Sequence, residues 1–348
     1  EIASCLVGSE MCIRDRLEEV TEIQPASTDR TRVSIVLEKE STLDAGFSTE
    51  NIANNHAAMA YRAGLEQNQA NMQAKIEKTT GEKLDVVWNL TLAANAISAN
   101  VEYGQIAEIE KVPGVKRVYV EDRYDPAVVN TELEADPNMS TSSSMIGTSA
   151  AYASGYTGAG SRIAVIDTGI DTDHQSFDAG AFDYSLEEQA SNAGKTVADY
   201  HLLNPAEINR VMDQLHVTGV TSDQLYVNSK IPFGYNYVDD DLDITHDNDT
   251  QGEHGSHVAG IASANRYLKR GEEYVSAGDA VGVVGNAPDA QLIVMKVFGN
   301  GGGAYDSDYM AAIEDAIILN CDSVNLSLGS SNAGMTTNST VSYTHLRA

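Results

Sequence analysis

Apolar and polar positions along the second half of the chain fall into blocks that predict strands alternating with helices. Short apolar runs that end in polar or glycine-containing turns predict strands at Arg162 to Asp167, Gln291 to Phe298 and Asp322 to Leu328. Helices are predicted at His254 to Ala264 and Asp308 to Leu319. Such alternation is typical of a parallel sheet with helices on both faces. The sequence therefore predicts an α/β domain over residues 150–340.

The first half of the chain has a different pattern, which predicts a smaller α+β domain over residues 30–124. Its longest helix, Asn51 to Lys78, is rich in Ala, Gln and Glu and contains no proline. Strands are predicted at Thr31–Leu37, Lys83–Leu90, Ala96–Tyr103 and Val115–Val120, with a second helix at Gln105–Lys111. This β-α-β-β-α-β order is that of a ferredoxin-like fold. Residues 125–149 are polar and rich in small residues, which predicts a linker.

Two short motifs place an acidic residue at a strand end and a histidine at a helix start. The run Ile163-Ala-Val-Ile-Asp167 leads into a glycine-containing turn, and His254-Gly-Ser-His257 opens a helix of small residues. A carboxylate that holds one imidazole nitrogen leaves the other nitrogen free to take a proton from a seryl hydroxyl. Asp167 and His254 are therefore predicted as two members of an Asp–His–Ser triad. Each residue alone has a simpler alternative, a turn Asp and an ordinary histidine at a helix start.

These motifs and their order resemble the subtilases, the subtilisin-like serine peptidases, whose triad runs Asp, His, Ser along the chain. The likeness is greatest to the lactocepin-type cell-envelope proteinases, and further similar segments are Ile231–Val238, Val281–Pro288, Val294–Phe298 and Ser323–Gly329. The resemblance implies that Asp167 and His254 are catalytic and that His257 packs or hydrogen-bonds structurally. A zinc site at His254 and His257 is the alternative, but no Cys or third His is spaced to complete it.

The resemblance also calls for a nucleophilic Ser in a Gly-Thr-Ser motif after His254, and residues 255–348 contain no Gly-Thr-Ser run. The Asn that completes the oxyanion hole in this family is also expected beyond Thr340. We therefore expect an inactive fragment of a serine endopeptidase. The alternative is a non-catalytic protein with a degenerate triad, in which the N-terminal domain serves as an inhibitor or folding module.

The N-terminal domain resembles the inhibitory propeptide that precedes the catalytic domain in subtilases. The resemblance rests on the β-α-β-β-α-β pattern and on Pro113-Gly114-Val115, which stands before an alternating strand with an acidic exit. It implies that the enzyme is made as a zymogen, that its own propeptide is an intramolecular inhibitor, and that processing occurs within residues 125–149. The alternative is an unrelated ferredoxin-like domain.

Two segments resemble walls of the peptide-binding cleft in this family. Ser327, Leu328 and Gly329 match the extended strand beside the pocket for the residue that precedes the scissile bond. Gly301, Gly302 and Gly303 match the edge segment that pairs with the substrate main chain. Such pairing supplies main-chain hydrogen bonds, while pockets set selectivity. A flexible surface loop is the alternative for the glycine run.

No cofactor is expected for the chemistry, but a structural calcium ion is expected at one of two places. Asp279, with the carbonyl groups of Val281 and Val283, matches a calcium site of compact subtilases, although Ser176 stands where those proteins have an Asp ligand. The acidic run Asp239–Asp243 offers enough oxygen atoms for calcium. It lacks the spacing of a known calcium loop, which favours a solvated acidic surface.

Composition narrows the range of partners. The chain has 348 residues and a net charge of −29, which disfavours binding to nucleic acid or to an anionic membrane. No apolar run reaches the length of a membrane span. We expect a protein or peptide substrate and a secreted or cell-envelope bacterial protein. Cys321 is the single cysteine away from the N-terminal segment, and packing is favoured over a reactive thiol.

Both ends of the chain are expected to be foreign to the gene. One choice of codons for residues 341–348 has a reverse complement that encodes residues 8–15 in order. This match indicates a DNA tag or adapter that was read from opposite strands at the two ends of an assembled fragment. Residues 1–16 and 341–348 are therefore set aside from the fold predictions.

Overall fold

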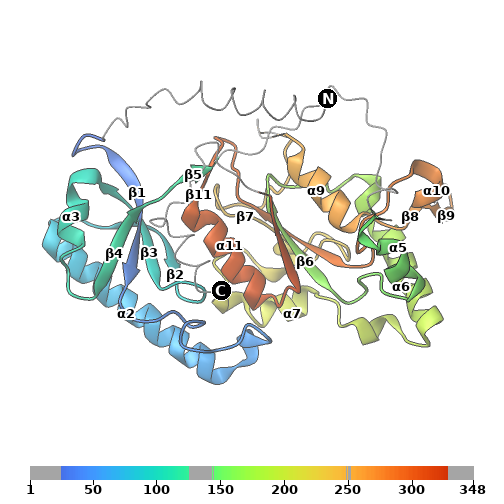
Figure 1. Ribbon diagram of the computed structural model, residues 1–348, viewed down its shortest axis with the longest axis horizontal. Helices are drawn as coiled ribbons and strands as arrows, with labels where there is room; N and C mark the ends of the chain where they lie inside the picture. Colours follow the sequence, from blue (N-terminus) through green and yellow to red (C-terminus); the bar gives the residue numbers. More distant parts are fainter. Residues whose placement is uncertain (1–24, 125–142, 144, 248, 250–251, 328–348) are drawn as a thin grey trace, which may run out of the picture.

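The computed structural model describes residues 25–124, 143, 145–247, 249 and 252–327. Figure 1 shows a smaller N-terminal domain, coloured blue to cyan, beside a larger domain, coloured green to red. The two terminal segments predicted to be foreign lie outside the described residues, as does most of the predicted linker. None of the described helices combines the length and the apolar character that a membrane crossing requires.

The N-terminal domain is a four-stranded antiparallel sheet with helices on one face. Its strands are β1 (Arg30–Leu37), β2 (Asp85–Leu90), β3 (Ala96–Glu102) and β4 (Val115–Val120), in the spatial order β2-β3-β1-β4. Its helical elements are η1 (Ile52–Asn54), α2 (His56–Thr80), η2 (Tyr103–Gln105) and α3 (Ile106–Ile109). The Asn55 side chain caps α2 by accepting hydrogen bonds from the backbone N–H groups of Ala57 and Ala58. The predicted order of strands and helices is confirmed, although the second helix, α3, has only four residues.

The two faces of this sheet are buried by different partners. Val33 and Ile35 of β1 pack in an apolar cluster with Met72 and Ile76 of α2. Ser34, which points to the opposite face, is also fully buried. Since neighbouring residues of a strand point to opposite faces, a polar face that is buried has to find hydrogen-bond partners. Ser34 donates to the Glu121 carboxylate of its own domain, and this carboxylate also accepts from Ser307 of the larger domain.

The larger domain is built on a parallel sheet in the spatial order β12-β6-β10-β7. The strands are β6 (Arg162–Asp167), β7 (Phe233–Asn236), β10 (Gln291–Lys296) and β12 (Ser323–Leu326). The helical elements are α5 (Thr148–Ala153), η3 (Gln175–Phe177), α6 (Ala179–Ala193), η4 (Val197–Tyr200), α7 (Pro205–Asn209), η5 (Met212–Gln214), α8 (Ser222–Leu225), α9 (His254–Ser263), α10 (Ala277–Val281) and α11 (Asp306–Ile318). A hairpin of β8 (Tyr267–Arg270) and β9 (Glu273–Ser276) follows α9.

Helices cover both faces of the parallel sheet, as predicted. Ile166 of β6 packs in one cluster with Ala312 of α11, whereas its neighbour Val165 packs in another with Ala259 of α9. Figure 1 shows α9 and α11 on opposite sides of β6. The α/β fold class is confirmed, and the motifs of Asp167 and His254 lie on β6 and α9.

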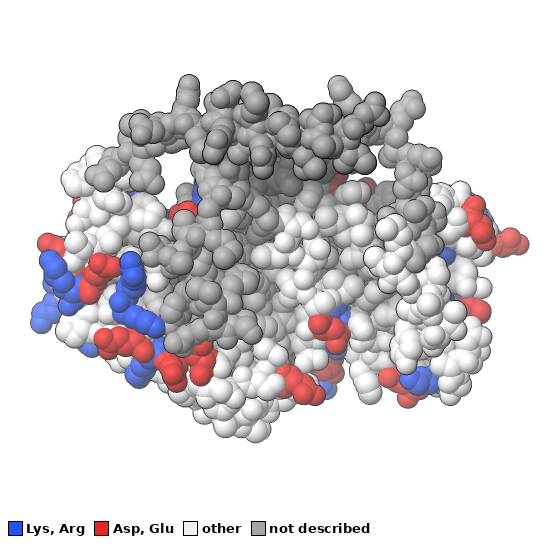
Figure 2. Space-filling model, in the orientation of Figure 1, with Lys and Arg blue, Asp and Glu red and all other residues white. Residues whose placement is uncertain are grey.

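The two domains share one apolar core. Trp88 and Leu90 of β2 belong to the same buried cluster as Tyr237 and Ala312 of the larger domain. A short two-stranded sheet also links them, because β5 (Arg123–Tyr124) pairs antiparallel with β11 (Ala304–Tyr305). Figure 2 shows Lys and Arg side chains beside Asp and Glu side chains on the visible face of the N-terminal domain.

Candidate active site

Asp167 and His254, which are 87 residues apart in the sequence, are hydrogen-bonded in the structure. Nδ1 of His254 lies 2.8 Å from Oδ1 of Asp167. Asp167 is the last residue of β6, and His254 is the first residue of α9. The Asp167 side chain is 1% exposed and that of His254 is 12% exposed. A buried carboxylate thus holds Nδ1 of a ring whose Nε2 is not used in this bond.

Backbone contacts fix this geometry, and Gly255 makes them possible. A Cβ atom at Gly255 would lie 2.0 Å from the carbonyl oxygen of Gly169, in the turn after Asp167. Gly169 itself has a φ of +106°, which favours glycine. Thr168 ties the motifs together, since its Oγ1 accepts from the Gly255 N–H at 2.9 Å and its N–H donates to Asp167 at 2.7 Å. The first turn of α9 therefore lies directly on the end of β6.

Lys296 is a further residue at this end of the sheet. It lies within Val294–Phe298, a segment that resembles the subtilases, but no role was predicted for it. Its Nζ donates to the Thr168 carbonyl oxygen and lies 2.6 Å from Oδ2 of Asp249. The side chains of this ion pair are 3% and 4% exposed. Lys296 thus links the turn after Asp167 to the loop that leads to His254. Its position at the end of a buried strand was the available signal.

The second histidine of the motif has a different environment from the one expected. His257 is exposed on α9, so the expected packing role is not what the structure shows. Among the described residues, no group of three or more His, Cys, Asp or Glu side chains could hold a metal ion. The zinc alternative at His254 and His257 therefore finds no further ligand within the described chain.

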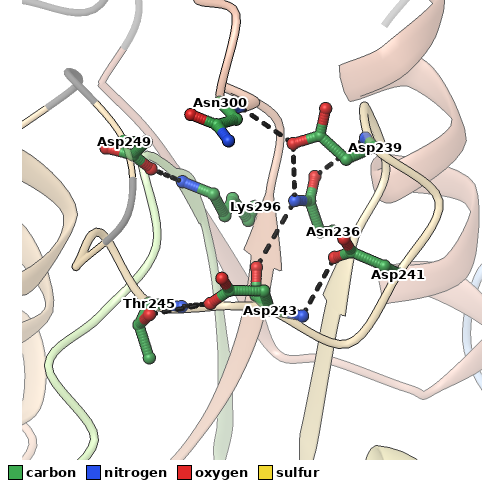
Figure 3. Close-up of a pocket in the computed structure, with 8 residues that line it drawn as sticks. All are labelled: Asn236, Asp239, Asp241, Asp243, Thr245, Asp249, Lys296 and Asn300. Atoms are coloured by element: carbon green, nitrogen blue, oxygen red, sulfur yellow. Dashed lines mark hydrogen bonds and ion pairs between the residues drawn. The ribbon is translucent and has the colours of Figure 1, made fainter.

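The acidic run lines a pocket of about 280 Å³ beside Lys296 (Figure 3). Its carboxylates accept hydrogen bonds from their own loop and its neighbours: Asp239 accepts from the Asn300 N–H at 2.9 Å, and Asp241 accepts from the Asp243 N–H at 2.9 Å. Asp243 in turn accepts from Thr245. These bonds give the acidic run a structural role in shaping the loop before His254.

The glycine run lies next to a paired extended segment, and that segment comes from the same chain. Arg123 of β5 donates from Nη2 to the Gly302 carbonyl oxygen at 2.9 Å. A Cβ atom at Gly303 would lie 2.1 Å from Nε of Arg123, so glycine lets the two segments approach. The ring of Tyr124 meets Tyr309 edge-on, at 5.8 Å between centroids. The end of the N-terminal domain therefore runs along the segment that was predicted to pair with substrate.

The sequence profile of the Subtilase family (Peptidase S8) matches residues 158–346, which is more than half of the chain. This chain belongs to the subtilase family. The matched range includes both Asp167 and His254, so the hydrogen-bonded pair lies within a domain of serine peptidases.

Individual relatives of this subtilase include a lactococcal proteinase and an extracellular protease of Bacillus subtilis. It is 31% identical to the PI-type proteinase of Lactococcus lactis subsp. cremoris over 275 residues, which is 77% of this chain and 12% of that protein. It is 26% identical to the minor extracellular protease Vpr of Bacillus subtilis over 79% of this chain and 28% of that protein. The chain thus spans a small part of these relatives. A solved structure of the epidermin leader peptide processing serine protease of Staphylococcus aureus aligns over 92% of this chain and 57% of its own, with a TM-score of 0.48 and 14% identity.

The calcium site predicted in this subtilase finds little support in the described residues. Asp279 is exposed in the short helix α10, and Val281 and Val283 follow it along the same segment. One exposed carboxylate is a poor fit to the six to eight oxygen ligands of calcium. The ion stays a prediction. Equal melting temperatures with calcium and with a chelator would contradict it, because a ligand that binds only the native state raises stability.

Two further predicted residues lie near β12. Ser327 directly follows this strand, and its hydroxyl donates to Oδ1 of Asn325 at 3.0 Å. Leu328 and Gly329 lie outside the described residues.

Cys321 is half-buried and packs against the core, and burial raises the pKa of its thiol to about 12. A thiol with this pKa is protonated at neutral pH, which agrees with the packing role.

Proposed function

We propose that the chain is the zymogen part of a secreted or cell-envelope serine endopeptidase, in which Asp167 and His254 are catalytic. The observation that carries the proposal is the 2.8 Å contact between Nδ1 of His254 and Oδ1 of Asp167 at the end of a parallel strand. Membership of the subtilase family supports the reaction class. The names of the lactococcal proteinases and of Vpr support a protein substrate and an extracellular location.

The geometry gives each residue of the pair a distinct role. The Asp167 carboxylate accepts a hydrogen bond from Nδ1–H of His254, which fixes the tautomer that leaves a lone pair on Nε2. Nε2 can then take the proton of a seryl hydroxyl and return it to the leaving amine. The imidazolium formed in between is stabilised by the buried Asp167 carboxylate. For the reaction to occur, a seryl hydroxyl and the oxyanion donors have to reach this edge of the sheet.

The N-terminal domain is proposed to be the inhibitory propeptide. Support comes from β5, whose Tyr124 and Arg123 pair with Ala304 and Tyr305 in an antiparallel register. A peptide substrate that paired with β11 would need the same main-chain groups. The domain therefore blocks this edge as long as it stays bound, and cleavage in residues 125–149 would free it to leave.

Support also comes from hydrogen bonds between the polar face of the N-terminal sheet and α11. The Glu121 carboxylate accepts from the Ser307 hydroxyl at 2.8 Å and from the Ser34 hydroxyl at 2.8 Å. The Glu314 carboxylate accepts from the backbone N–H groups of Leu92 and Ala93 at 2.7 and 2.8 Å. These bonds satisfy polar groups that would otherwise be buried without partners.

The test of the proposed function uses the complete gene of the parent enzyme. The purified enzyme should hydrolyse casein, and a serine-directed covalent inhibitor should stop it. His254→Ala should abolish hydrolysis, and Asp167→Asn should lower kcat by about 10⁴. His257→Ala is the matched control on the same helix and should retain most of the activity. An enzyme that survives His254→Ala but not His257→Ala would contradict the assignment.

A further inference from the structure

His216 lies at the junction of the two domains and contacts groups from both. It follows η5 in the segment between Asp167 and His254, and its side chain is 8% exposed. Its Nδ1 lies 2.7 Å from Oδ1 of Asp315 on α11. Its Nε2 lies 3.3 Å from the carbonyl oxygen of Asn89 in the N-terminal domain. Both ring nitrogens therefore face oxygen atoms, and one of these belongs to the other domain.

The partners of this ring can only accept protons. The Asp315 carboxylate already accepts from the Tyr237 hydroxyl at 2.8 Å and from the His216 backbone N–H at 2.9 Å. The Asn89 oxygen is a main-chain carbonyl, which has no proton to donate. A neutral imidazole has one N–H, so it would turn a lone pair toward one of these oxygens. An imidazolium has two N–H groups and satisfies both contacts.

The charged groups around His216 also favour the imidazolium. Two carboxylates on α11 face it, Asp315 and Glu314, whose Oε2 lies 3.6 Å from Nε2. One cation approaches from α2, where Arg62 donates to the Gln214 carbonyl oxygen at 2.8 Å. Burial lowers the pKa of His216, but Asp315 and then Glu314 outweigh burial and Arg62, and the pKa lies above its usual 6.5.

We propose that protonation of His216 strengthens the docking of the N-terminal domain, so that a rise in pH loosens the turn between β2 and β3 from α11. The proton is taken from solvent onto Nε2 when Asn89 approaches. Loss of this proton removes the N–H group that donates to the Asn89 carbonyl oxygen. It also removes the positive charge that faces Glu314 and Asp315. This turn is also the segment whose amides Glu314 binds, so its main contacts with α11 weaken together.

The direction of this effect is fixed by linkage. Asp315 and Glu314 lie in the same domain as His216 and favour its proton whether or not the N-terminal domain is docked. Docking adds the Asn89 carbonyl oxygen, which accepts from Nε2 only when the ring is charged, so the proton that makes this contact is bound more tightly in the docked state. Its contribution to docking is complete at a pH where the undocked ring is still protonated, and is lost as the pH rises through the pKa of the docked ring, which lies above 6.5. If the N-terminal domain is the inhibitor proposed above, an alkaline shift favours its release. The docking effect itself does not depend on that function.

The chain contains one tryptophan, Trp88, and it reports on this contact. Its ring meets the His216 ring edge-on, at 5.9 Å between centroids, and is 9% exposed. The experiment is a titration of the full chain from pH 6 to 9.5, followed by tryptophan emission. We expect a shift of the emission maximum to longer wavelength, with a midpoint above pH 6.5. His216→Gln should remove this step, whereas His56→Gln, at an exposed position, should keep it.

Hydrogen exchange of the unmodified chain provides a second measurement that needs no variant. Protection of the amides of residues 91–93, relative to those of residues 164–166 in β6, should fall across the same pH step. A wild-type emission maximum that stays constant together with unchanged relative protection would overturn the proposal. A step that persists in folded His216→Gln would do the same. Neither readout uses peptidase activity, so failure of the proposed function and failure of this inference are distinguishable.

Discussion

The indole Nε1 of Trp88 donates a hydrogen bond to Oδ1 of Asp308 at 2.9 Å, across the junction of the two domains. The same carboxylate oxygen accepts from Nη1 of Arg32 at 2.8 Å, and Oδ2 accepts from the Tyr305 N–H at 3.0 Å. Asp308 therefore caps the start of α11 and holds two side chains of the N-terminal sheet. It is 2% exposed, so water does not replace these partners.

Asp308→Ala should lower the unfolding free energy more than the removal of an exposed charge does. It leaves Arg32 and the Trp88 N–H without their partner, and the expected loss is about 2–3 kcal/mol of unfolding free energy. Urea unfolding followed by Trp88 emission measures it. Asp85→Ala is the matched control, since the Arg30–Asp85 pair is 57% exposed on both sides and should contribute about 0–1 kcal/mol. Equal effects of the two variants would contradict this account.

The stability of the junction should also fall between pH 4 and pH 7. Burial raises the pKa of Asp306 from 3.8 to about 6, so the folded chain holds this proton more tightly than the unfolded chain does. Its contribution is complete below pH 3.8 and is lost as the pH rises through about 6. Asp306→Asn should flatten the dependence of the urea midpoint on pH in this range, and Asp223→Asn, at an exposed site, should not. An unchanged slope in Asp306→Asn would refute the assignment.

Gly255→Ala should disrupt the contact between Asp167 and His254. The added Cβ would lie 2.0 Å from the Gly169 carbonyl oxygen, which is backbone and has no rotamer to move away. We expect a loss of about 1–3 kcal/mol. NMR should show the downfield Nδ1 proton of His254 disappear. Gly260→Ala on the same helix meets nothing within 4 Å and should stabilise the chain by about 0.5–1 kcal/mol.

The 348-residue chain by itself should not react as a serine peptidase. Asp167 and His254 can orient and accept a proton, but no Gly-Thr-Ser motif follows His254 to supply the hydroxyl. Loss of a single oxyanion donor already costs about 10²- to 10³-fold in turnover. A fluorophosphonate probe should therefore leave the mass of the chain unchanged. Stoichiometric labelling that His254→Ala removes would show that another hydroxyl acts as the nucleophile.

Local patterns predicted the elements that are bounded by strong signals. β6 has the predicted bounds, because an apolar run ends there in a glycine-containing turn. α11 begins two residues earlier than predicted, at Asp306. Asp308 is the third helical residue, and its side chain accepts a hydrogen bond from the backbone N–H of Tyr305, the residue before the helix. The segment between Asp167 and His254 was not divided into elements, although Asp178 and Gly194 bound α6 and Asn204 caps α7. Its helices α6, α7 and α8 were not predicted.

The sequence by itself determined the pair Asp167 and His254, the parallel sheet that carries them and the order of strands in the N-terminal domain. These features depend on residues that are close in the chain or on the family motif. Only the tertiary structure decided how the polar face of the N-terminal sheet is satisfied and which residues surround His216. Arg32 and Asp308, for instance, are 276 residues apart. A polar strand face looks the same in a sequence whether it faces water or another domain, because the partner that makes its burial favourable is chosen by packing.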